Sequence, residues 1–138
     1  MALTNAQKAA VLDALYGGKP LNVPDKLYIG LSTTQPSSDG TNFTEPTGNA
    51  YARVEVTNDS TTWEDATVDN PSVKKNKIPI LFNEATGPWG TITHWGIFDA
   101  PEGGNLLDWA PVLNPTSVGE GQQAQFRAGD LQTRLQDA

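Results

Sequence analysis

From Lys26 onward, apolar residues recur at every second position, and this spacing constrains the fold more than any other feature of the sequence. Leu27, Ile29 and Leu31 fall on one face of an extended segment, because successive side chains of a β-strand point to opposite sides. Residues 51–57 alternate in the same way, which is typical of a half-buried antiparallel strand. A helical interpretation fails for both segments.

The remaining strands follow from turn signals and apolar runs. Residues 89–98 form the most apolar stretch and are expected to be a central strand, and the turn at 99–104 predicts a hairpin with residues 105–112. Pro79 lacks an N–H group, so its strand is expected at an edge or a bulge. Alternation also marks residues 124–135. About seven or eight short strands result, which predicts a mainly β fold: an antiparallel β-sandwich, jelly roll or Greek-key barrel.

Residues 4–16 form the one expected α-helix. Thr4 occupies the N-cap position, Gln7 the capping-box position, and residues 17–18 are glycines that end the helix. Its apolar stripe at helical spacing comprises Ala6, Ala10, Val11, Ala14 and Leu15. We expect this helix to dock on its own domain; the alternative is an arm that docks on a neighbouring subunit.

The chain length of 138 residues predicts one domain over 1–138, with the helix or arm over 4–16 and a β domain over 26–136. Residues 35–50 are rich in Pro, Gly, Ser, Thr and Asn, which predicts a long surface loop. Residues 58–76 are polar, and we expect a solvated segment there.

The formal net charge of −7 argues against direct binding to nucleic acid, where affinity depends on Lys and Arg. No apolar run approaches the roughly 20 residues that span a bilayer, and the N-terminal residues are not signal-like. We therefore expect synthesis in a cytoplasm and no membrane partner. The sequence contains no cysteine, which excludes disulfides and thiolate chemistry.

The sequence offers little for catalysis, and we expect no catalytic residue, metal site or cofactor. The single histidine, His94, lies inside a predicted strand without a nucleophile elbow and is interpreted as structural. Residues 38–42 and 58–65 contain oxygen ligands, but neither matches a calcium-binding loop, so polar turns are favoured. Gly103 and Gly104 precede no helix that could receive a phosphate.

Four tryptophans suggest a carbohydrate-binding alternative, since flat aromatic faces are good contact surfaces. Trp89 and Trp95 lie in or next to the apolar central strand and are expected in the core. Trp63 and Trp109 have polar neighbours and are the better surface candidates.

The chain resembles a family of short virion proteins of tailed bacteriophages, of the tail-fibre-like or capsid-decoration type. The shared motifs, in order along nearly the whole chain, lie at residues 27–34, 51–54, 89–100, 103–107 and 126–131. The resemblance implies a non-enzymatic β domain of the phage particle and supplies no catalytic residue. Residues 58–77 are longer and more charged than the family pattern, so partner contacts are not transferred through them.

The leading hypothesis is a capsid decoration protein, made in the host cytoplasm, that binds the outer surface of the major capsid protein. The acidic charge favours the particle exterior, and the absence of heptads or fibrous repeats argues against a stalk. The candidate partner-binding residues are Leu3, Val11, Leu15, Phe43, Trp63 and Trp109. The alternatives are a tail, baseplate or tail-fibre component, and a glycan-binding module that uses Trp63 or Trp109. In all three cases a multi-copy or homo-oligomeric protein is expected.

Overall fold

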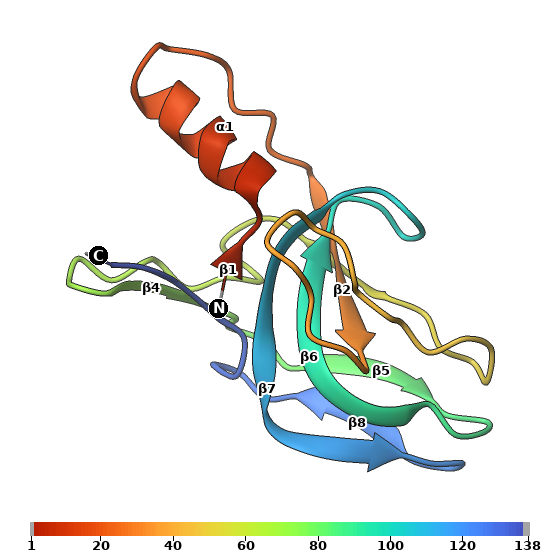
Figure 1. The fold of residues 1–138 in the computed structure, drawn as a ribbon. Coiled ribbons are helices and arrows are strands. Elements are labelled where there is room, and N and C mark those ends of the chain that lie inside the picture. The colour runs from red at the N-terminus through yellow and green to blue at the C-terminus, as the bar shows by residue number, and fades with distance from the viewer. Residues whose placement is uncertain (1, 137–138) are drawn as a thin grey trace.

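The computed structural model describes residues 2–136 and is mainly β with one N-terminal helix, as the periodicity predicts (Figure 1). Its elements are β1 (Ala2–Leu3), α1 (Asn5–Leu15), β2 (Lys26–Ser32), β3 (Val54–Thr57), β4 (Ser72–Lys75), β5 (Ile80–Glu84), β6 (Gly90–Phe98), β7 (Leu106–Val118), β8 (Gln123–Phe126) and β9 (Gln132–Leu135). Residues 1, 137 and 138 of the expected domain lie outside the described residues. That the chain forms one domain stays a prediction.

Five strands form the large antiparallel sheet, in the order β1-β7-β6-β2-β3. The apolar β6 lies at its centre, as predicted. The predicted hairpin is also confirmed, because Phe98 pairs with Leu106 and Gly96 with Trp109. The Asp99 carboxylate closes the turn by accepting bonds from the backbone N–H of Asn105 at 2.7 Å and from its side-chain amide at 3.0 Å.

Two small sheets, β4-β9 and β5-β8, complete the β structure. The core brings Ile29 and Trp95 of the large sheet together with Ile80 and Phe82 of β5 and with Leu131, which precedes β9. Figure 1 shows β6 and β7 as two long strands that curve together. This two-layer arrangement matches the predicted sandwich class.

Strand β5 is the strand that Pro79 was expected to place at a sheet edge or at a bulge, and the structure agrees. Within the described residues β5 pairs with β8 alone, and its register is irregular between Leu81 and Glu84. Pro79 lies directly before β5, where its missing N–H removes no ladder bond.

Two segments differ from the sequence-based expectation. The strand expected over 51–57 is only β3, because Tyr51 turns its ring against Phe82 and Trp89 in the core. The polar segment 58–76 contains β4, which pairs with β9. Local polarity hid β4, since its four residues are half-buried and its partner lies about 60 positions further along the chain.

Helix α1 forms where predicted but is anchored differently. The Thr4 hydroxyl makes no capping bond; it donates instead to the carbonyl of Leu106 at 2.9 Å, while the Thr4 N–H donates to the carbonyl of Leu107 at 3.0 Å. The capping-box prediction is therefore wrong. The expected docking on the domain is also wrong: no residue of α1 is buried, and Figure 1 shows the helix projecting away from the sheets.

Candidate partner-binding surfaces

The six candidate contact residues do not share one surface. Val11 and Leu15 lie on the projecting helix, where Leu15 is 67% exposed. Leu3, in β1, is half-buried beside β7. The other three, Phe43, Trp63 and Trp109, pack largely against the β structure. Whether any of the six binds a partner stays a prediction.

Trp63 is buried, with 8% of its surface exposed, so its expected surface position is wrong. Its backbone pairs with Asn76, and this bridge directs the ring into the hydrophobic core. The polar neighbours in the sequence gave no sign of this: Thr61 and Glu64 are exposed, whereas Thr62 is buried together with Trp63. Its indole N–H is buried without a hydrogen-bond partner.

Trp109 is half-buried and packs edge-on against the His94 ring, with the centroids 5.7 Å apart. Its indole N–H is also buried without a partner. Trp63 therefore presents no open flat face of the kind on which the glycan-binding alternative depended, and Trp109 is half-buried.

Phe43 anchors the loop over 35–50 to the sheet. Its ring meets Phe98 edge-to-face, with centroids 4.9 Å apart, and it lies so close to Gly96 that a Cβ atom there would be 2.6 Å from the Phe43 ring. Gly96 thus makes room for a side chain that comes from a loop far away in the sequence. The predicted irregular segment exists, but its aromatic residue points inward.

A buried ion pair completes this anchor. The Arg53 guanidinium and the Glu45 carboxylate are 2.6 Å apart, and the Arg53 side chain is only 6% exposed. Arg53 also donates to the carbonyls of Ala100 at 2.7 Å and Gly103 at 2.9 Å, and it lies 3.5 Å from the centre of the Phe98 ring. These contacts tie the loop to the β6–β7 hairpin.

Tyr51 extends the same network. Its hydroxyl donates to Glu45 at 2.5 Å and accepts from the N–H of Leu31 at 3.0 Å. Burial, reinforced by the Glu45 carboxylate, raises the pKa of Tyr51 above its ordinary value of 10.0 and keeps the donor protonated. Sequence reasoning missed this network, although Tyr51 and Arg53 both belong to a motif on which the family resemblance rests.

His94 and the polar residues 38–42, which the sequence analysis interprets as structural and not as catalytic or metal-binding, make local contacts. The Nδ1 atom of His94 lies 2.8 Å from the Thr93 hydroxyl, and burial lowers the pKa of the ring. The Asp39 carboxylate accepts from the N–H of Thr41 at 3.1 Å and from its hydroxyl at 2.6 Å, so residues 38–42 form a polar turn. Residues 2–136 contain no group of three His, Cys, Asp or Glu side chains that could hold a metal ion.

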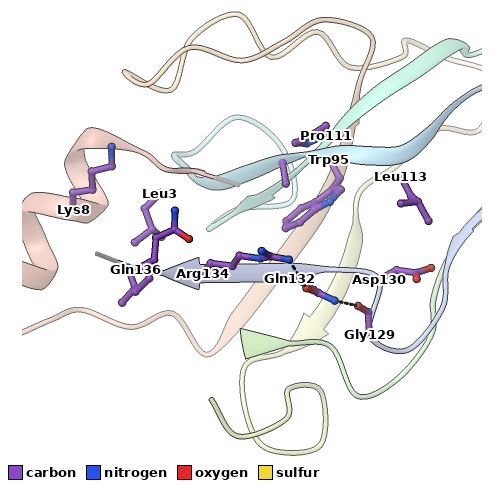
Figure 2. Close-up of a pocket in the computed structure, with 12 residues that line it drawn as sticks. Leu3, Lys8, Trp95, Pro111, Leu113, Gly129, Asp130, Gln132, Arg134 and Gln136 are labelled. Carbon is purple, nitrogen blue, oxygen red and sulfur yellow. Dashed lines mark hydrogen bonds between the residues drawn. The ribbon is translucent and has the colours of Figure 1, made fainter. Parts of the chain in front are cut away.

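A groove with a volume of about 790 Å³ lies between the start of α1, β7 and β9. Figure 2 shows Trp95 pointing from the sheet toward β9, with Leu3 near the helix and Leu113 at the opposite end. Lys8 and Arg134 are its cations, and Asp130 is its one acidic residue. The Asp130 carboxylate is engaged by Arg127, whose Nε lies 3.5 Å away and whose backbone N–H donates to it at 2.8 Å. The lining of the groove is therefore mixed, with exposed apolar side chains beside two cations and one carboxylate that is already paired.

These features define a β-sandwich in which the motif residues Tyr51 and Arg53 serve packing. The chain belongs to the family described as podophage GP4 fiber I protein gp80, whose model matches residues 2–134. It is thus a bacteriophage structural protein of the virion, of fibre type, which associates with other virion proteins; the family implies a non-enzymatic role. No curated protein matches the chain. No helix within residues 2–136 has the length and apolar character needed to cross a membrane.

Proposed function

We propose that this protein is a component of the phage fibre apparatus on the particle exterior, and that α1 is the arm by which it attaches to a neighbouring virion protein. The family match favours the fibre over the capsid surface. The observation that carries the arm assignment is the exposure of α1, none of whose residues is buried.

The apolar side chains of the arm support an interface. Leu12 is 57% exposed, Leu15 67% and Tyr16 78%. Helices of this length are marginal in water when no tertiary contact supports them. A partner surface that covers these side chains would stabilise the helix and remove apolar area from water.

Attachment is tested by replacing Leu12 and Leu15 with serine in the phage and measuring incorporation of the protein into purified particles. We expect a large loss of incorporation, while the isolated protein keeps its circular dichroism spectrum. The matched control is Leu81→Ser, because Leu81 is 51% exposed but lies on β5, away from the arm. Normal incorporation of the arm variant would contradict the assignment.

Capsid decoration is the alternative that the net charge of −7 and the absence of a fibrous repeat support. Copy number separates the two. A few copies per particle, located at the tail by cryo-electron microscopy, are expected for a fibre component. A copy number near that of the major capsid protein would replace this proposal with decoration.

A further inference from the structure

We propose that the groove between α1, β7 and β9 binds the acidic turn formed by residues 64–70 of a second copy of this chain. This self-association is independent of whether the protein sits on the fibre or on the capsid. The two surfaces are complementary in charge and in apolar character.

Two cations, Lys8 and Arg134, line the groove, and neither forms an ion pair with another of the described residues 2–136. Arg134 makes only a 3.3 Å contact from Nη2 to the side-chain oxygen of Gln132. Two leucines that also line the groove are exposed: Leu113 is 84% exposed and Leu135 58% exposed. An occupant with carboxylates and an apolar side chain would satisfy both features.

The turn over residues 64–70 has those properties. Glu64, Asp65 and Asp69 give it three negative charges and no positive one, and every residue of the turn is exposed. Val68 is fully exposed, at 104%. A fully exposed valine flanked by acidic residues is an apolar contact point that nothing in its own chain covers.

The turn is held in shape before any partner arrives. The N–H of Glu64 donates to the carbonyl of Lys75 at 2.9 Å, and the N–H of Thr67 donates to the carbonyl of Val73 at 3.0 Å. The Ser72 hydroxyl closes the turn by donating to the carbonyl of Thr67 at 2.6 Å. A prearranged turn loses little conformational entropy on binding.

The position of the turn suits a two-fold arrangement. Ser72 pairs with Leu135, so the base of the turn and one rim of the groove lie at the same end of the β4-β9 sheet. A two-fold operation can then place each turn in the other copy's groove and form the contact twice. The helix is a poorer occupant, because residues 4–16 contain Lys8 and Asp13 and carry a net charge of zero (+1 and −1).

Two reciprocal charge reversals test the contact in solution. Sedimentation velocity over a concentration series is expected to show a monomer–dimer equilibrium for the wild type, weakened by added salt. Lys8→Glu with Arg134→Glu, or Asp65→Lys with Asp69→Lys, is expected to weaken dimerisation at least about tenfold, or about 1.4 kcal/mol. Mixing the two double variants is expected to restore the dimer as a heterodimer.

Three further variants complete the test. Val68→Ser is expected to weaken dimerisation without changing the thermal melt, because the side chain is fully exposed. Leu81→Ser and Lys19→Glu alter an exposed leucine and an exposed lysine outside the turn and the groove, and both are expected to dimerise as the wild type does. A wild type that stays monomeric at every concentration would overturn the proposal, even if the groove binds another virion protein. A folded pair of reversed variants that does not form the heterodimer would also overturn it.

Discussion

Helix α1 and the loop segment over residues 35–50 both contain candidate partner-binding residues, but the body of the protein holds them in opposite ways. The segment is fastened by Phe43 against Phe98 and by the buried pair of Glu45 and Arg53. The helix is fastened at its first turn, through Thr4, and buries none of its own residues. The comparison teaches that a long polar loop can be a rigid part of the core, whereas a regular helix can be the free element.

The largest effect on stability is expected from removing the Arg53 side chain, which holds the loop to the β6–β7 hairpin. Arg53→Ala should lower the free energy of unfolding by about 3 kcal/mol, because it leaves the Glu45 carboxylate without its partner and two hairpin carbonyls without a donor. Urea denaturation measures this loss. Arg127→Ala is the control, since that side chain is 78% exposed, and it should change stability by less than about 0.5 kcal/mol. Equal losses of stability in the two variants would show that the contacts of Arg53 stabilise the protein no more than an exposed ion pair does.

Adding a side-chain atom at Gly96, against which the Phe43 ring packs, is expected to have the next largest effect on stability. Gly96→Ala should destabilise the protein by roughly 1 to 3 kcal/mol, because the added Cβ would lie 2.6 Å from Phe43 and 2.7 Å from Leu106. In a double-mutant cycle, Phe43→Ala should relieve part of that cost. Strictly additive effects would argue that the two residues do not share the site.

Removing the Tyr51 hydroxyl is expected to have a smaller effect. Tyr51→Phe should lower the free energy of unfolding by about 1 to 1.5 kcal/mol, because the N–H of Leu31 and the Glu45 carboxylate each lose a hydrogen bond.

The raised pKa of Tyr51 also makes the stability of the protein depend on pH, with a defined sign. Its contribution is fully present below the ordinary value of 10.0 and is lost as the pH rises above it, since the unfolded phenol ionises and the folded one resists. The stability of the wild type should therefore fall more steeply than that of Tyr51→Phe above pH 10.0. Parallel pH profiles would contradict this.

The smallest effect on stability is expected from substitutions in helix α1. Leu12→Ser and Leu15→Ser together should change the free energy of unfolding of the isolated protein by less than about 0.5 kcal/mol, because both side chains are more than half exposed. Thermal or urea unfolding measures this directly. A loss comparable to that of Arg53→Ala would show that α1 packs on its own body in solution, and the contrast between helix and loop would disappear.

Local sequence was sufficient for the regular elements of the large sheet. Alternation of apolar residues over β2 and the apolar run of β6 indicate strands, and each of these strands ends in four consecutive buried residues. The hairpin between β6 and β7 was predictable from a glycine-rich turn between two apolar runs. The helix was also predictable in position, since its stripe and its terminal glycines are local features.

Long-range contacts decided the rest. The candidate surface residue Trp63 became part of the core because its neighbour Asn76 is held from the other end of the chain: the Asn76 amide donates to the carbonyl of Arg127 at 3.0 Å and accepts from the N–H of Leu131 at 2.9 Å. The pairing of β4 with β9 likewise joins segments that look polar when read separately. No local window contains both partners of such contacts.

By itself, the sequence determined the strands β2 and β6, the hairpin of β6 with β7, the position of the helix and the resemblance of the chain to phage virion proteins, because periodicity, turn residues and ordered motifs are properties of short stretches. Only the tertiary structure decided which exposed-looking residues are buried, how Arg53 and Glu45 fasten a loop, and that no residue of α1 is buried. The physical reason is that burial and ion pairing depend on residues brought together by the whole fold, and their energies are set by the surroundings that each side chain finds there.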